Sequence, residues 1–101
     1  MALHTVILSA AKSDIQSAYD WYESRQVGLG KQFKQEIIQA IDSIPDSRKG
    51  YGPVYLNLSR VFVKKFPYVI YFKIDFTRNK VVVYAILNEK QNREDILQDR
   101  T

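Results

Sequence analysis

The first half of the chain contains two stretches in which apolar residues recur at helical spacing. In the first stretch, Ser13 with Gln16 three residues later predicts a helix that begins with a capping box. The buried stripe expected for this helix consists of Ile15, Ala18, Tyr19 and Tyr22. Trp21 lies beside this stripe, near its edge.

A short break leads into the second stretch. Gly28-Leu29-Gly30 interrupts the first helix because two glycines stand so close together, and Pro45-Asp46 is expected to end the second helix. The second stripe consists of Leu29, Phe33, Ile37, Ile41 and Ile44. Two helices joined by so short a break predict a helical hairpin.

The second half of the chain changes to the alternation that is typical of strands. Strands are expected at positions 54–58, 61–66, 69–76 and 81–87, after a first strand at positions 3–8. Pro67 predicts a turn or bulge, because proline cannot donate to a central ladder, and positions 77–80 predict a hairpin turn. Positions 88–101 are polar and fit either a short helix or an irregular tail. The sequence therefore predicts one α+β domain over residues 1–101: an N-terminal strand, an α-helical hairpin and then a three- to four-stranded antiparallel sheet.

Alternation gathers cations and aromatic rings on the sheet face that we expect to point away from the hairpin. That face is expected to carry Arg60, Phe62, Lys64 or Lys65, Phe66, and Tyr68 or Tyr71. Such a surface fits RNA, through phosphate contacts and base stacking. It fits equally an amphipathic peptide, with aromatic anchors and a cationic rim. The remaining alternative is an ordinary amphipathic sheet with a solvated outer face.

The composition narrows the class of protein further. Fifteen Lys and Arg against eleven Asp and Glu give a net charge of +4, which favours a nucleic-acid or acidic-protein partner and is also compatible with a solvated basic surface. The absence of cysteine excludes a disulfide scaffold, a thiolate metal site and a cysteine nucleophile, and fits a reducing cytoplasm. We expect a cytoplasmic protein without membrane association, because no apolar run approaches about 18–20 residues and no signal peptide is evident.

The conventional signatures of cofactor and metal sites are missing from the sequence. No glycine-rich phosphate loop follows a strand, and His4 has no catalytic partner placed by sequence, so we expect His4 to be structural. Asp14, Asp20 and Glu23 are expected on a solvated helix face rather than around a metal ion. We therefore expect neither a cofactor nor a metal.

Two segments carry motifs that are specific in combination. The first contains Ala18-Tyr19-Asp20-Trp21-Tyr22-Glu23, then Gly28-Leu29-Gly30 and Phe33. The second contains Arg60, then Lys65-Phe66-Pro67-Tyr68-Val69-Ile70-Tyr71 and finally Val81-Val82-Val83-Tyr84-Ala85-Ile86. Together they resemble the helical hairpin, the basic-aromatic-Pro-Tyr passage and the last strand of the RelE/ParE family, whose members are toxins of type II toxin–antitoxin (plasmid stabilisation) systems. The resemblance spans most of the chain.

The resemblance implies a toxin that a cognate antitoxin, usually encoded beside it, neutralises by wrapping its helix and sheet surfaces. RelE-like members of the family cut mRNA in the ribosomal A site, whereas ParE-like members inhibit DNA gyrase. We expect a partner to bind at Trp21, Tyr22, Arg60, Phe62, Tyr68 and Tyr71.

The stretch after the last strand departs from the family pattern. Members commonly place a His and one or more Arg there, often followed by Pro and an aromatic residue, whereas this chain reads Asn-Glu-Lys-Gln-Asn-Arg-Glu-Asp-Ile from Asn88 to Ile96. Metal-free RNA cleavage needs a group that activates the 2′-hydroxyl and cations that stabilise the phosphorane. The candidate catalytic residues are Arg60, Lys64, Lys65, Tyr68 and Lys90, and a proton acceptor is not evident.

We therefore expect a ParE-like toxin that acts by binding, with DNA gyrase as the candidate target, rather than an enzyme. One alternative is a RelE-like, metal-independent endoribonuclease that cuts mRNA on the ribosome. The other is a protein-binding member of the family that has lost its toxicity.

Overall fold

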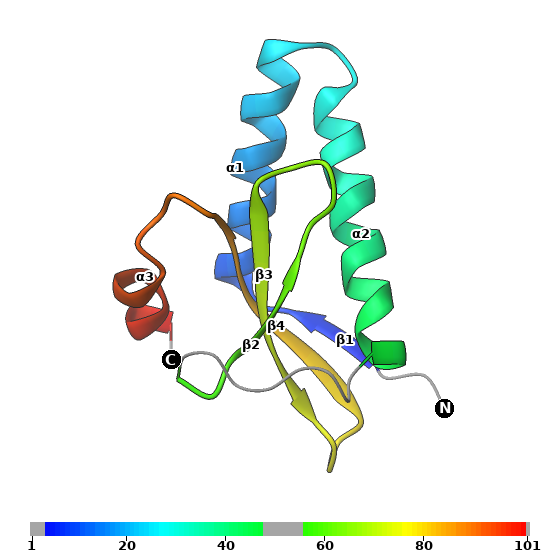
Figure 1. Cartoon of the computed structure of the whole chain (residues 1–101), viewed down its shortest axis with the longest axis vertical. Helices are drawn as coiled ribbons and strands as arrows, with labels where there is room; N and C mark the ends of the chain where they lie inside the picture. The colour runs from blue at the N-terminus through cyan, green and yellow to red at the C-terminus, as the bar shows by residue number, and fades with distance from the viewer. Residues whose placement is uncertain (1–3, 48–55, 101) are drawn as a thin grey trace.

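The computed structural model describes residues 4–47 and 56–100. Along these residues the elements follow in the order β1 (His4–Ile7), α1 (Ser9–Arg25), α2 (Leu29–Ser47), β2 (Ser59–Phe62), β3 (Tyr68–Asp75), β4 (Lys80–Asn88) and α3 (Arg93–Arg100). The strands form one sheet in the order β1-β4-β3-β2 (Figure 1). β2, β3 and β4 pair antiparallel, while β1 joins the edge of the sheet parallel to β4. The predicted α+β fold is confirmed. The last segment, for which the sequence leaves a short helix or an irregular tail open, contains the helix α3.

α1 begins four residues earlier than the predicted capping box. Leu8 holds the N-cap position with an extended backbone, and the Lys12 N–H donates to the Leu8 carbonyl (2.9 Å). Ala10 and Ala11 favour the helix intrinsically, so they continue it toward β1 in place of the expected connector. The prediction of a helix start at Ser13 is therefore wrong, and Ser13 is an exposed residue within the helix.

The turn between α1 and α2 is held by a carboxylate. Gly28 adopts a φ of 89°, which favours glycine, and Glu23 accepts hydrogen bonds from the N–H groups of Gly28 (2.8 Å) and Gly30 (2.9 Å). These donors are among the orphan amides at the start of α2, so Glu23 caps that helix from the preceding one. Gly30 also permits the close approach of the helices, because a Cβ there would lie 2.7 Å from the Tyr19 carbonyl oxygen. Glu23 is therefore part of the turn and not of a solvated face.

α2 carries its apolar stripe as predicted. Phe33, Ile37, Ile41 and Ile44 are all buried. The helix continues past Pro45 to Ser47, two residues beyond the stop that the sequence predicts. The strand expected at positions 54–58 lies partly outside the described residues. In its described part, Leu56 and Asn57 have positive φ and do not continue an extended strand.

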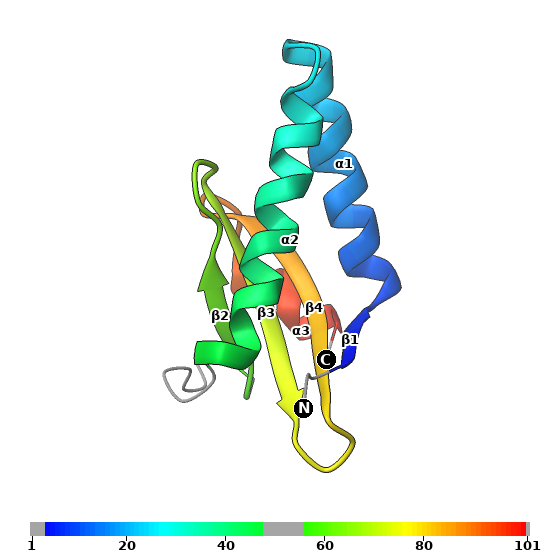
Figure 2. The same cartoon turned by 90° about the vertical axis from the view of Figure 1, so that its right-hand side faces the viewer.

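The helical hairpin lies on one face of the sheet and α3 on the other (Figures 1 and 2). Beneath the hairpin, the main core contains Phe33, Ile37, Ile70, Phe72, Val83 and Ile86. Beneath α3, Leu97 packs with Leu58, Val69, Tyr71, Ala85 and Leu87. The distal turns of the hairpin project beyond the sheet, as both views show.

A bulge in β4 shifts the alternation of its side chains. Tyr71 is opposite Ala85 while Phe72 is opposite Val83, so Tyr84 is the extra residue on β4. Tyr84 and Ala85 consequently both belong to the α3 side, although they are neighbours in sequence. The sides predicted for β3 are correct: Ile70 and Phe72 face the hairpin and Tyr71 faces α3.

The connection between β2 and β3 reverses the side of one predicted aromatic residue. Lys65 adopts a φ of 71°, and the Val63 N–H donates to the Tyr68 carbonyl (3.0 Å), which closes the turn predicted around Pro67. Phe66 therefore packs on the hairpin side instead of sharing the outer face. Tyr68 also packs on the hairpin side, so of the two tyrosines considered for the outer face, Tyr71 is the one on the α3 side.

Candidate functional site

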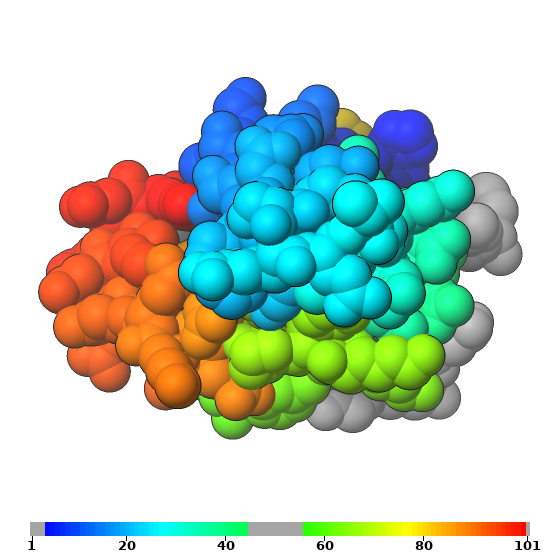
Figure 3. Space-filling view, turned by 90° about the horizontal axis from the view of Figure 1, so that it is seen from above, coloured from blue at the N-terminus to red at the C-terminus, as the bar shows by residue number. Residues whose placement is uncertain are grey.

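The residues predicted to bind a partner divide between two surfaces. Arg60, Phe62 and Tyr71 line a pocket on the α3 side of the sheet, which we call the outer pocket. Trp21, Tyr22 and Tyr68 line a groove between α1 and the end of β4, which we call the α1 groove. Asn88 and Gln91 contribute to both, because they stand where β4 runs into the loop before α3. Figure 3 shows this C-terminal segment, in orange and red, lying beside the hairpin.

The outer pocket has a volume of about 330 Å³ and carries charge of both signs. The Arg60 guanidinium lies 5.1 Å from the centre of the Phe62 ring, a cation–π contact. Arg93 enters from the start of α3, and the acidic residues of the pocket are Glu89 and Glu94. Within residues 4–47 and 56–100, neither arginine forms an ion pair. Both guanidinium groups are therefore available to an anionic group of a partner.

Three carboxamides add donors to the outer pocket. The side-chain oxygen of Asn88 accepts from Lys90 N–H (2.9 Å), that of Gln91 from Asn88 N–H (2.8 Å), and that of Asn92 from Asp95 N–H (3.3 Å). Because each oxygen is engaged by the backbone, the NH2 groups are what these side chains offer to a ligand. Sequence reasoning missed these residues because it treated them only as replacements for a family histidine and arginine.

The α1 groove is larger and more aromatic. Its volume is about 730 Å³, and it is lined by Asp14, Ser17, Ala18, Trp21, Tyr22, Pro67, Tyr68, Ile86, Asn88, Lys90 and Gln91. The Trp21 side chain is 52% exposed and packs edge-on against Tyr22, with ring centres 5.0 Å apart. Tyr68 packs against Phe33 (5.0 Å) and forms the floor with Tyr22 (6.1 Å). A half-exposed tryptophan above a floor of packed rings is a preformed anchor for an apolar side chain.

The floor of the groove disfavours a charged tyrosine. Burial, and to a lesser extent the charge and hydroxyl of Tyr68, raise the pKa of the Tyr22 phenol. Tyr22 therefore stays a neutral hydrogen-bonding group at physiological pH. The cations near this groove are Lys90 on its rim and Arg25, whose guanidinium lies 4.5 Å from the centre of the Trp21 ring.

The candidate catalytic residues do not meet at one point. Arg60 lines the outer pocket, whereas Tyr68 and Lys90 line the α1 groove. The Lys65 ammonium lies 3.5 Å from the Glu36 carboxylate of α2. Lys64 lines a third cavity, of about 210 Å³, between α2 and β2. The predicted set is thus spread over three separate surfaces.

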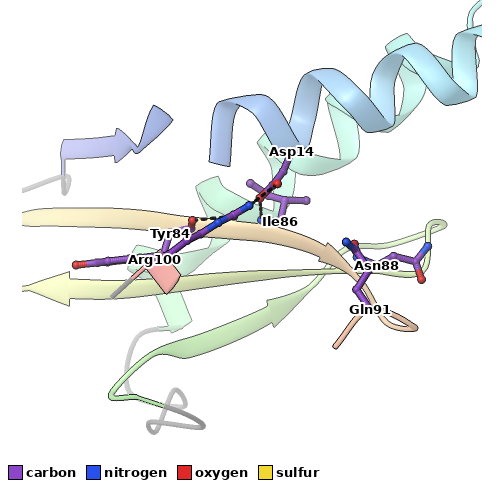
Figure 4. A network of polar contacts seen from close by, with 6 residues as sticks. All are labelled: Asp14, Tyr84, Ile86, Asn88, Gln91 and Arg100. Atoms are coloured by element: carbon purple, nitrogen blue, oxygen red, sulfur yellow. Dashed lines mark hydrogen bonds and ion pairs between the residues drawn. The ribbon is translucent and has the colours of Figure 1, made fainter. Parts of the chain in front are cut away.

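Sequence reasoning missed an ion pair between α1 and α3 (Figure 4), whose carboxylate, that of Asp14, lines the α1 groove. Arg100 of α3 reaches across the edge of β4 to Asp14 of α1, with N–O distances of 2.5 and 2.9 Å. Asp14 also accepts from Ile86 N–H (3.0 Å), and Arg100 also donates to the Tyr84 carbonyl (3.3 Å). The hydrogen bond to Asp14 raises the pKa of the Arg100 guanidinium. Asp14 is therefore a structural residue, and its predicted place on a solvated face is wrong.

The remaining expectations concern metals and membranes. In the described ranges, no group of three or more His, Cys, Asp or Glu side chains could hold a metal ion. His4 is an exposed residue of β1. None of the helices in residues 4–47 and 56–100 is long and apolar enough to cross a membrane.

Comparison with known proteins places this fold in a class. A solved structure described as "Chromosomal ParDE TA system from P. aeruginosa" superimposes with a TM-score of 0.67 at 18% sequence identity, covering 85% of this chain and 95% of that chain. This likeness shows that the chain shares the fold of that protein. No curated protein matches the chain in sequence.

A family model narrows the class to one family. The model described as "ParE toxin of type II toxin-antitoxin system, parDE" matches residues 6–93. The chain therefore belongs to the ParE toxin family, and it is a ParE-type toxin of a type II toxin–antitoxin system. The resemblance seen in the sequence is confirmed, and its ParE branch is the one that the family model matches.

Proposed function

We propose that this toxin acts by binding and not by cutting RNA, that its target is DNA gyrase in the cytoplasm, and that a cognate antitoxin neutralises it. The observation that carries the first part is the dispersal of Arg60, Lys65 and Tyr68 over separate surfaces. Cleavage of RNA requires an acceptor within about 3 Å of the 2′-hydroxyl and cations around the same phosphate. Of the candidate residues, only Tyr68 and Lys90 share a groove, so this dispersal argues against the convergence on one phosphate that cleavage requires.

Gyrase as the target is supported by membership of the ParE family. The two arginines of the outer pocket and the net charge of +4 suit a complex that contains DNA or an acidic protein surface. The same charge supports an acidic antitoxin, because complementary charges speed association and suppress wrong partners.

Purified components test the target directly. Supercoiling of relaxed plasmid by gyrase, followed with increasing toxin, should be inhibited, and inhibition should be relieved by an equimolar amount of the antitoxin encoded in the neighbouring frame. Purified ribosomes with mRNA form the parallel arm, and we expect no toxin-dependent cleavage there. Cleavage that Arg60→Ala abolishes, with supercoiling unaffected, would replace this proposal with the endoribonuclease.

Induced expression in a bacterial host gives the cellular readout. With DNA and protein synthesis followed by radiolabel incorporation, we expect DNA synthesis to fall first. An earlier fall in protein synthesis would contradict the gyrase target. Undisturbed growth, with soluble folded protein confirmed, would point to a binding protein without toxicity.

A further inference from the structure

The half of β4 that follows β1 has an open edge. β1 pairs with β4 only as far as Ile7 opposite Val83, and the Leu8 N–H to the Val83 carbonyl is the last backbone contact along that side. Beyond this point, side chains replace a neighbouring strand. Arg100 donates to the Tyr84 carbonyl, and Asp14 accepts from the Ile86 N–H. Unpaired strand edges are templates for the addition of another strand.

The outermost backbone groups of this edge are the least protected. Among the described residues, the Asn88 N–H donates to the side chain of Gln91 alone, and Gln91 is exposed and easily displaced. The Ile86 carbonyl faces the same edge, because the N–H and C=O of a strand residue point to the same side. No side chain of the described residues donates to that carbonyl. If another segment paired with β4 in the parallel direction, one of its residues could satisfy both groups. The N–H of that residue would donate to the Ile86 carbonyl, and its carbonyl would accept from the Asn88 N–H.

The α1 groove lies alongside this edge. Its α1 wall runs from Asp14 to Trp21, which is about 10 Å, or roughly three residues of extended chain. A side chain that points from an added strand toward the hairpin would enter the groove between Trp21, Pro67 and Tyr68. Lys90 on the rim offers a cation, whereas the charge of Asp14 is already matched by Arg100.

We propose that an extended, acidic segment of the antitoxin adds to the sheet at Ile86–Asn88 and places an apolar side chain in the α1 groove. The inference rests on neutralisation by an antitoxin, as proposed above, and assigns the place and form of that contact. Charge selects this occupant: a second copy of the chain also carries +4 and would be repelled, whereas an acidic segment is attracted. In the complex, the Asp14–Arg100 ion pair stays intact and limits how far the added strand extends along β4 toward β1.

Two matched variants test occupancy of the groove. Ser17 is an exposed α1 residue in the groove wall, and Ser13 is an exposed serine of the same helix outside it. Ser17→Arg fills the groove, while Ser13→Arg adds the same charge elsewhere. The affinity of the purified neighbouring antitoxin, measured by calorimetry, should fall at least about tenfold for Ser17→Arg and stay within about twofold for Ser13→Arg. Circular dichroism and thermal unfolding confirm that both variants fold.

Amide hydrogen exchange of the wild-type toxin tests strand addition without any substitution. The Asn88 amide should exchange at least about tenfold more slowly in the complex than in the free toxin. An unchanged Asn88 rate overturns strand addition, and wild-type affinity of Ser17→Arg overturns use of the groove. If the toxin forms dimers without antitoxin and its Asn88 amide already exchanges slowly in that state, the edge of β4 is covered by a second copy of the chain. That result would also overturn the proposal.

The failure of the inference is distinguishable from that of the proposed function. If the antitoxin binds and neutralises wild-type toxin while Ser17→Arg binds equally well, only the place of contact is wrong. If the neighbouring protein does not bind wild-type toxin, neutralisation and its proposed site both fall.

Discussion

Replacing Asp14 with alanine should destabilise the fold more than any other single carboxylate change on α1. The substitution removes two charge-assisted hydrogen bonds to Arg100 and the acceptor for the Ile86 N–H. The two side chains are only 15% and 21% exposed, so water cannot fully replace these contacts. Bonds to charged groups contribute about 1.5–3 kcal/mol each, and a stranded partner adds to the loss. With partial solvation, we expect Asp14→Ala to cost about 2–3 kcal/mol, or roughly 10 °C or more in Tm.

Chemical denaturation of the wild type, Asp14→Ala, Arg100→Ala and the double variant measures this effect. The coupling energy between the two positions should be at least about 1 kcal/mol. Asp20→Ala provides the control on the same helix and should cost less than about 0.5 kcal/mol, because Asp20 is exposed and, among residues 4–47 and 56–100, bonds only to Gln16. A coupling energy near zero would refute the view that the pair fastens α3 to α1.

Three further predictions concern the hairpin and the titration of the groove. Gly30→Ala should lower the free energy of unfolding, measured by denaturant titration, by about 1–3 kcal/mol, because the new Cβ would lie 2.7 Å from the Tyr19 carbonyl oxygen. This cost should exceed the gain from the better helix propensity of alanine. A stabilised variant would show that α1 and α2 can move apart freely. Because the pKa of Tyr22 is raised in the folded protein, the tyrosine of the unfolded chain ionises first as the pH rises. The stability that Tyr22 contributes is therefore intact below about pH 10 and is lost as the pH rises above that value. Tyr22→Phe should lack this loss when the free energies of unfolding of the variant and the wild type are compared between about pH 9 and 11. Lys65→Ala should change stability by less than about 0.5 kcal/mol, since the Lys65 side chain is 76% exposed in its pair with Glu36, and a larger loss would mean that the β2–β3 turn depends on this contact.

The sequence predicts those parts of the fold that depend on local periodicity. The α2 stripe and the opposed faces of β3 follow directly from spacing, because each residue's environment is set by residues a few positions away. The two glycines of the hairpin turn were also recognisable, and the structure supplies the reason in the φ of Gly28 and the close contact at Gly30.

The candidate site was predictable only in its residue types. Arg60, Phe62 and Tyr71 share a pocket as alternation suggests, but the positive φ of Lys65 turns the following residues toward the hairpin. Periodicity cannot anticipate such a local reversal, so the sequence alone leaves open whether Tyr68 or Tyr71 lies on the outer face, and the structure places Tyr71 there. Asp14 and Arg100 were missed because they are 86 positions apart, and no sequence spacing relates them.

Because Asp14 and Arg100 are 86 positions apart, the contact between them can form only late in the synthesis of the chain. During synthesis, β1 and the hairpin emerge early, whereas the arginine that fastens α3 emerges only after β4. Until α3 docks, the apolar side chains of Val69, Ala85 and Leu87 on the outer sheet face have no cover from Leu97. The nascent chain thus passes through a stage in which these apolar side chains of the outer sheet face are not yet covered by α3.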